Sequence, residues 1–285
     1  MRSLIGSTQK AAQVFSTDLD DCGERSSSLK ELSTRVCLEV ADNVYSKVFD
    51  GTNTWIVSDA EQERVVIIDP GPASSRHLAS YSTAHKKDKV KICAVLLTHD
   101  HPDHSAGAEE LASTHQVPLF SRRAGNLPDG ELTSVKAICD IQVVSLPGHS
   151  SDSVGFCLPS EGAIISGDTL LEHVFPVITW PDGSIGEYFD SLEKIKTLVE
   201  MGRYHYLLPG HGEPLLSPLE LVKRTRQHQE DRLELIEKLV SRYGADDASM
   251  LVAKIYGKLD PFLLHLAWMN TQARLAYLKE AHERS

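Results

Sequence analysis

The sequence lacks any apolar run long enough for a membrane span. None of its 285 residues falls in an uninterrupted apolar stretch approaching the roughly 18 residues that cross a bilayer. Residues 1–20 also have no apolar core of a secretory signal. We therefore expect a cytoplasmic protein with no membrane partner. The opening MRSLIGSTQKAAQVFST has two basic and no acidic residues, so it resembles a mitochondrial transit peptide, and the mitochondrial matrix is the alternative location.

Cysteines are few, and no two of them form a CxxC pair. The sequence has only five, which are widely spaced: Cys22, Cys37, Cys93, Cys139 and Cys157. This pattern excludes a disulfide framework and a zinc cluster held by thiolates. Cys93 and Cys157 lie in apolar runs, so we expect them to be small core residues.

Basic residues are outnumbered by acidic ones. The 29 Lys and Arg against 40 Asp and Glu give a net charge of −11, which argues against a broad nucleic-acid surface. Residues 221–285 hold eleven basic and nine acidic residues, a balance of +2, so residues 1–220 carry −13. A local basic patch near the C-terminus therefore stays open. The sequence gives no indication of an oligomeric state.

The chain divides into three parts by composition. Residues 1–32 are polar and rich in serine, which predicts a flexible tail. Residues 33–220 contain two series of short β-type runs, each followed by helical segments, and residues 221–285 are helical in pattern. We predict an α/β fold in which two sheets lie between helices. Strands are expected at 35–40, 53–59, 64–71, 92–99, 117–120, 141–149, 153–159, 162–171 and 204–212, and helices at 77–87, 105–115, 187–200, 219–244, 249–257 and 263–283.

The stretch VLLTHDHPDHSAG, at 95–107, crowds three histidines and two aspartates behind an apolar run. Imidazoles and carboxylates are the ligands that suit zinc and similar divalent metals when no thiolate is offered. Burying so many titratable groups without a metal would cost several kcal/mol. The loop therefore predicts ligands for two adjacent metal positions: His99, His101, Asp103 and His104.

Three further candidate ligands follow apolar strands, each directly after a glycine. These are His149 in SLPGHSSDS, Asp168 in IISGDTLL and His211 in LLPGHGEP. The glycine allows a tight turn toward a common site. Alone, each has an ordinary explanation, because a histidine after a strand is usually a surface or core residue and Asp168 could cap a helix. Together with the 99–104 cluster they favour metal binding.

THDHPDH resembles the HxHxDH signature of the metallo-β-lactamase superfamily, and the three later positions match its remaining motifs over roughly residues 35–220. The resemblance implies a four-layer αβ/βα sandwich with two Zn²⁺ ions, or iron or manganese, between the sheets. It assigns His99, His101 and His149 to one metal and Asp103, His104 and His211 to the other, bridged by Asp168. Asp69, in IIDPG, would support these ligands without binding metal.

The same resemblance implies hydrolysis by a hydroxide that bridges the metals, so that no Ser or Cys nucleophile is needed, with Asp103 as the catalytic carboxylate. Ser150 follows His149 where the family more often has Thr, and we expect it to tune that ligand. Asp168 stands where some zinc β-lactamases have Cys, which argues against antibiotic hydrolysis. The 43 positions from Asp168 to His211 leave no room for the domain inserted in some RNA-processing nucleases.

Four stretches, among them GTNTWIV and LPGHGEP, look most like the subfamily of β-lactamase-like endoribonucleases and bacterial hydrolases with a glyoxalase-II-like core. That likeness implies a winged-helix-like domain at 221–285, for which a purely structural cap is the alternative. The first hypothesis is hydrolysis of a small ester or thioester. The alternatives are a single-strand endoribonuclease that uses aromatic platforms, an iron-dependent sulfur oxygenase and a non-catalytic binding module. The platforms would be Tyr243, Tyr256, Trp268 and Tyr277.

The loop from Leu170 to Trp180 follows Asp168 and should lie beside the metals. Its stretch HVFPVITWP offers Phe175 and Trp180 as apolar walls of a substrate pocket. The alternative is that both rings pack beneath the loop.

Overall fold

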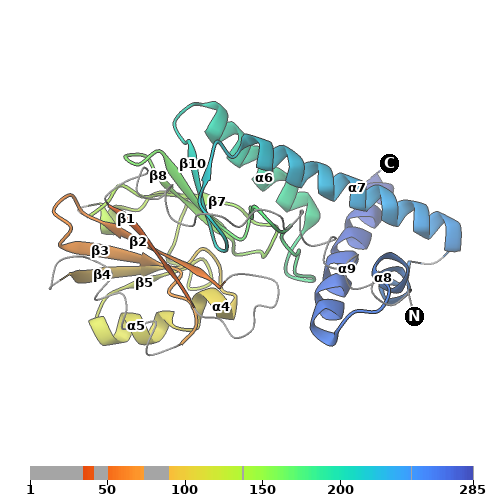
Figure 1. Ribbon diagram of the computed structural model, residues 1–285, viewed down its shortest axis with the longest axis horizontal. Helices are drawn as coiled ribbons and strands as arrows, with labels where there is room; N and C mark the ends of the chain where they lie inside the picture. Colours follow the sequence, from red (N-terminus) through yellow and green to blue (C-terminus); the bar gives the residue numbers. More distant parts are fainter. Residues whose placement is uncertain (1–34, 42–50, 74–89, 137, 245, 285) are drawn as a thin grey trace, which may run out of the picture.

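Two β-sheets form the centre of the protein in a computed structural model (Figure 1). The structure describes residues 35–41, 51–73, 90–136, 138–244 and 246–284. The tail predicted at 1–32 and the helix predicted at 77–87 lie outside these residues. Within them, no helix is both long and apolar enough to span a bilayer.

The first sheet has five strands in the order β1-β2-β3-β4-β5. The β1–β2 and β2–β3 pairs are antiparallel, with β2 and β3 forming a hairpin, while β3, β4 and β5 run parallel. Asp59 closes the hairpin by accepting hydrogen bonds from the backbone of Glu63 and Arg64. The strands are β1 Val36–Val40, β2 Asn53–Ser58, β3 Arg64–Ile68, β4 Lys91–Leu96 and β5 Leu119–Phe120.

The second sheet has six strands in the order β11-β10-β9-β8-β7-β6. β9 and β10 run parallel, and the other neighbours are antiparallel. Every residue of β8 and β9 is buried, as expected for strands that are covered on both faces. The strands are β6 Gly130–Glu131, β7 Gln142–Ser145, β8 Val154–Leu158, β9 Ala163–Gly167, β10 Tyr206–Pro209 and β11 Leu215–Leu216.

The helices cover the outer faces of both sheets, which confirms the predicted four layers (Figure 1). Leu111 and Ala112 of α5 pack on the outer face of the first sheet, while α6 and part of α7 pack on the second. α6 begins at a serine cap, where the Ser184 hydroxyl accepts a hydrogen bond from the Glu187 backbone. The helices are α4 Pro102–Ser105, α5 Ala108–His115, α6 Ile185–Glu200, α7 Leu219–Tyr243, α8 Ala248–Tyr256 and α9 Pro261–Arg284, with a short 3₁₀ turn at Thr133–Val135.

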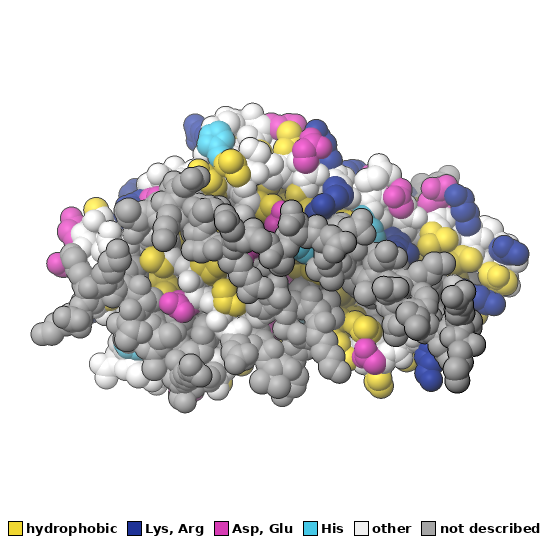
Figure 2. Space-filling view, viewed as in Figure 1, with side chains coloured by type: hydrophobic (Ala, Val, Ile, Leu, Met, Phe, Trp, Pro, Cys, Tyr) yellow, Lys and Arg dark blue, Asp and Glu magenta, His cyan; other side chains and the backbone are white. Residues whose placement is uncertain are grey.

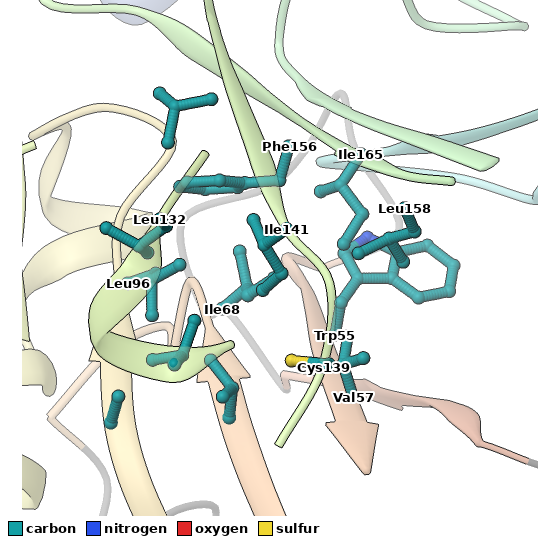
Figure 3. Close-up of a cluster of buried hydrophobic side chains, with 14 of the residues drawn as sticks. Trp55, Val57, Ile68, Leu96, Leu132, Cys139, Ile141, Phe156, Leu158 and Ile165 are labelled. Atoms are coloured by element: carbon teal, nitrogen blue, oxygen red, sulfur yellow. The ribbon is translucent and has the colours of Figure 1, made fainter. Parts of the chain in front are cut away.

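The main apolar core lies between the two sheets. Trp55 and Ile68 of the first sheet meet Phe156 and Ile165 of the second in one buried cluster (Figure 3). Cys157 is also buried, as predicted, whereas Cys93 is only half-buried. Because this core joins the sheets face to face, it fixes the relative position of the loops that leave their strands.

The C-terminal helices pack together at one end of the molecule (Figure 1). α8 and α9 share a small apolar cluster that contains Val252 and Ala267. α9 buries the polar residues Asn270 and Arg274 as well as alanines. This confirms the helical character of 221–285. The boundary predicted at residue 220 falls inside α7, and the described part of the segment has no strand, so a winged-helix-like domain stays a prediction.

Phe156 tests how far the fold depends on the core between the sheets. Its side chain is fully buried in that core, so replacement by alanine leaves a large cavity. We expect Phe156→Ala to lower the free energy of unfolding by about 3–5 kcal/mol in urea denaturation. Met201→Ala is the control, because Met201 is 66% exposed, and it should change the free energy by less than about 0.5 kcal/mol. Equal effects of the two variants would contradict this account of the core.

Candidate metal centre

The sequence-predicted ligands all follow strand ends at one edge of the two sheets. His99 comes three residues after the last residue of β4, and α4 then carries Asp103 and His104. In the second sheet, Asp168 directly follows β9, and His211 follows β10. Two backbone hydrogen bonds join the sheets here, from Val154 to Thr98 and from Asn53 to Gly210, at 2.8 and 2.7 Å.

One group of ligands consists of three histidines. The ring centroid of His99 lies 4.6 Å from that of His101 and 5.0 Å from that of His149. His101 Nδ1 and His149 Nε2 are 3.0 Å apart. Each of the three rings offers a nitrogen, and these nitrogens lie within 4.8 Å of one another, which is close enough to share one metal ion.

The second group consists of Asp103, His104 and His211. Asp103 Oδ2 lies 3.6 Å from His104 Nε2 and 3.3 Å from His211 Nε2. Their ligand atoms also lie within 4.8 Å of one another. A second metal ion therefore fits next to the first.

Asp168 lies between the two groups. Its Oδ1 is 3.5 Å from His104 Nε2, and its Oδ2 is 3.5 Å from His211 Nε2 and 3.9 Å from His149 Nε2. Among the described residues, Asp168 Oδ1 and the Nε2 atoms of His99 and His104 are buried without a hydrogen bond. Buried polar atoms normally have partners, and leaving them without any is costly. A divalent cation would satisfy them, so the donor set fits a metal pair.

Asp69 orients two parts of the cluster from behind. Its carboxylate accepts hydrogen bonds from the Thr98 backbone at 2.7 Å and the Thr98 hydroxyl at 2.6 Å, and its Oδ2 is 3.1 Å from His104 Nδ1. Because the Thr98 hydroxyl donates to Asp69, its oxygen can accept the Nδ1 proton of His99, 3.0 Å away. Protonation at Nδ1 leaves Nε2 of His99 and His104 as the nitrogens that would bind a metal. Asp69 itself has a φ of 53°, a strained value of the kind found at functional sites.

Backbone carbonyls orient two other ligands. His149 Nδ1 lies 2.5 Å from the Val177 carbonyl oxygen, and His211 Nδ1 lies 2.7 Å from that of Gly51. The Ser150 hydroxyl has other partners, since it lies 2.8 Å from Asp152 Oδ1 and 2.7 Å from Ser153 Oγ. That Ser150 tunes His149 stays a prediction.

Two of the predicted glycines make room for the cluster. Gly167 has a φ of 51°, and a Cβ there would lie 2.6 Å from Thr98 Oγ1. A Cβ on Gly210 would lie only 2.2 Å from Asp168 Oδ1. Gly210 is thus required for the close approach of a strand end to the bridging carboxylate.

Comparisons with known proteins point to one family. Residues 48–129 match the family model of the metallo-beta-lactamase superfamily. The chain is 26% identical over 281 residues to the lactamase-like protein nscB of Trichophyton rubrum, covering 88% of this chain and 84% of that protein. It is 29% identical over 250 residues to an atrochrysone carboxyl ACP thioesterase of Aspergillus fumigatus, covering 80% and 75% of the two chains.

Solved structures show the same fold. A beta-lactamase domain protein from Burkholderia ambifaria aligns with a TM-score of 0.73 at 19% identity, covering 95% of this chain and 94% of the other. A metallo-beta-lactamase family protein from Thermus thermophilus aligns with a TM-score of 0.68 at 21% identity, covering 88% and 95%. The chain is thus similar in sequence to proteins of the metallo-β-lactamase superfamily and has the fold of its solved members. The seven side chains that the sequence singled out lie close together, and their roles as ligands stay a prediction.

Burial and nearby charges leave some of the candidate ligands neutral and others ionised. Burial lowers the pKa of His99 well below its usual value and that of His149 to about 4, so both rings are neutral. Burial is the largest single influence on His211 and opposes its charge, but the Asp168 and Asp103 carboxylates together outweigh it and raise the pKa of His211 to about 9. For Asp103, burial acts to raise the pKa, but His104 and His211 together outweigh it and the pKa falls to about 2. Without metal, the protonated ring of His211 therefore lies beside the carboxylates of Asp103 and Asp168.

A cavity of about 490 Å³ opens beside His101 of the candidate metal centre. It is polar, and its lining includes Arg122, Arg123 and Asp182. Neither of the two aromatic residues predicted as apolar walls lines this cavity. Phe175 stacks on His228 of α7, with 3.6 Å between ring centroids. Trp180 lines a separate cavity of about 690 Å³ between α7 and α9, because those helices offer it an apolar surface.

Gly210 provides a test of the bridging position. The Cβ of Gly210→Ala would displace the Asp168 carboxylate, so we expect metal affinity to fall by about 10–100-fold in chelator competition. Gly186→Ala is the matched control, because no atom lies closer than 3.7 Å to a Cβ there. Unchanged metal affinity in Gly210→Ala would show that Asp168 does not hold metal.

The raised pKa of His211 provides a test that does not need a substrate. Below about pH 9 the metal-free ring is protonated, and it must lose this proton to bind a metal. We therefore expect metal binding at pH 7 to release protons and to strengthen as the pH rises toward about 9. Calorimetry in buffers of different ionisation enthalpy measures this release. No release at pH 7 would contradict the protonated metal-free state.

Proposed function

We propose that this protein is a dinuclear metal-dependent thioesterase. The observation that carries the proposal is the position of Asp168 between two ligand groups, with atoms 3.5 Å from His104 and His211 and 3.9 Å from His149. His99, His101 and His149 would hold one ion, and Asp103, His104 and His211 the other. Zinc is the proposed metal, because His and Asp ligands without thiolate suit it, and iron or manganese are the alternatives.

The chain's own residues would bind and orient, while the metals supply the reactive centre. When bound, a pair of divalent ions lowers the pKa of a water and polarises a carbonyl oxygen. Asp69 and the Val177 carbonyl fix the ring orientations of His104 and His149, so the ligand nitrogens point inward. The Asp103 side chain is 43% exposed and ionised at neutral pH, so it is placed to accept a hydrogen bond from the attacking water. This supports Asp103 as the catalytic carboxylate.

A thioester substrate is supported by the relatives and by the cavity. The similarity to a carboxyl ACP thioesterase extends over 80% of this chain. The cavity beside His101 is lined by arginines, serines and aspartates rather than apolar side chains, which suits a polar acyl group or carrier arm. We infer a small-molecule acyl thioester, and esters are the nearest alternative class.

RNA cleavage has less support. Tyr256, Trp268 and Tyr277 pack into apolar clusters, so they are not stacking platforms, and of the four predicted aromatics only Tyr243 is strongly exposed. Along α7, basic and acidic side chains lie side by side rather than in one basic patch (Figure 2). Arg226 and Lys238 each pair with a glutamate of the same helix. The comparisons also give no support to an RNA substrate.

The proposal is tested with zinc-loaded protein and a panel of acyl-CoA thioesters, aryl esters, lactones and unstructured RNA. We expect thioester hydrolysis that chelation abolishes, and a loss of more than about 100-fold in kcat/KM for Asp168→Asn. Asp190→Asn, an exposed position on α6, is the control with unchanged activity. Metal analysis of protein grown without added zinc identifies the metal. A zinc-loaded sample that is inert toward every thioester and ester but cleaves RNA would overturn the proposal.

A further inference from the structure

We infer that Asn270 of α9 is a positioning residue for the metal ligand His149. The inference rests on the metal centre of the proposed function. Asn270 is only 4% exposed, and its Oδ1 accepts a hydrogen bond of 3.1 Å from the backbone N–H of Ile178. The carbonyl group on the other side of that same peptide bond belongs to Val177, and it accepts the Nδ1 proton of His149.

One planar peptide unit therefore connects α9 with a metal ligand. The N–H and C=O of a trans peptide point in opposite directions and cannot rotate independently. An acceptor that fixes the Ile178 N–H also fixes the direction of the Val177 carbonyl, and with it the His149 ring. Hydrogen bonds in such a chain also polarise one another, which strengthens the bond to the ring. The ring's Nε2 is then held toward His101 Nδ1, 3.0 Å away.

Other contacts hold the backbone near His149 but not its ring. Thr179 donates to the His149 carbonyl from its backbone at 3.1 Å and from its hydroxyl at 2.7 Å. Ser151 donates to Asp182 from its backbone and hydroxyl. These bonds join the two loops, yet neither contacts the imidazole. The direction of the ring depends on the Val177–Ile178 peptide.

Asn270 is itself held in place by a buried arginine. Arg274 is 2% exposed and donates to the Asn270 carbonyl at 3.0 Å and to Gln229 Oε1 of α7 at 2.6 Å. Burial lowers the pKa of Arg274 to about 10, which leaves it charged at neutral pH. The arginine thus locks α9 to α7 at the residue that reaches the loop. The C-terminal helices accordingly do more than cover apolar surface, because they set the geometry of a metal ligand.

The test uses the full-length protein with zinc alone as the probe. Asn270→Leu keeps the volume but removes the acceptor, and Asn270→Ala is studied beside it in case one of them fails to fold. Asn270→Asp restores an acceptor oxygen. Gln272→Ala, half-buried on the same helix, is the matched control. The readouts are the zinc affinity of each site by chelator competition, the imidazole ¹⁵N resonances of His149, and the melting temperature without metal.

We expect Asn270→Leu and Asn270→Ala to weaken one of the two zinc sites by about 10–100-fold and to shift the His149 Nδ1 resonance. Asn270→Asp should recover most of both, and Gln272→Ala should change neither. A loss of melting temperature with unchanged zinc affinity and unchanged resonances would overturn the inference and leave the proposed function intact. Wild-type protein that binds no metal would overturn both. Wild-type protein that binds two metals without cleaving thioesters would overturn only the proposed substrate.

Discussion

The carboxylate of Asp168 is the buried charge around which the rest of the centre is arranged. It is 8% exposed and lies within 4 Å of three imidazoles, one on α4 and two that follow β7 and β10. A buried carboxylate is strongly unfavourable unless cations or donors surround it. The two sheets therefore have to meet at this point with high precision. The apolar core between them, the glycine at 210 and the two backbone hydrogen bonds across the sheets provide that precision.

Much of the sheet architecture and the position of the ligands could be predicted from the sequence. The strands before His99, Asp168 and His211 are short apolar runs that end abruptly in a polar side chain, and this contrast is a local signal. The two-residue strands β6 and β11 were not predicted. They form only by pairing with β7 and β10, which is a tertiary effect.

The groups that orient the ligands were harder to predict, for a physical reason. The partners of His149 and His211 are backbone carbonyls that lie 28 and 160 positions away in the chain. Every residue has a carbonyl, so no residue type identifies the partner. The surroundings of the two loop aromatics were hard to predict for a related reason. Phe175 and Trp180 were placed beside the metals from their distance in sequence to Asp168, but α7 and α9 offered them competing surfaces whose docking position no local pattern reveals.

The His149 ring is oriented by a backbone carbonyl rather than by a side chain. A peptide carbonyl keeps its direction whatever side chain its residue carries, as long as the peptide plane is held. The loop from Leu170 to Trp180 is held through the Ile178 N–H and through Thr179, so many of its side chains take no part in fixing His149. Several of them, such as Leu170 and Ile178, are buried in the apolar core instead. The position of α9, by contrast, is coupled to the metal ligand, so a shift of this helix would alter the chemistry as well as the shape of the molecule.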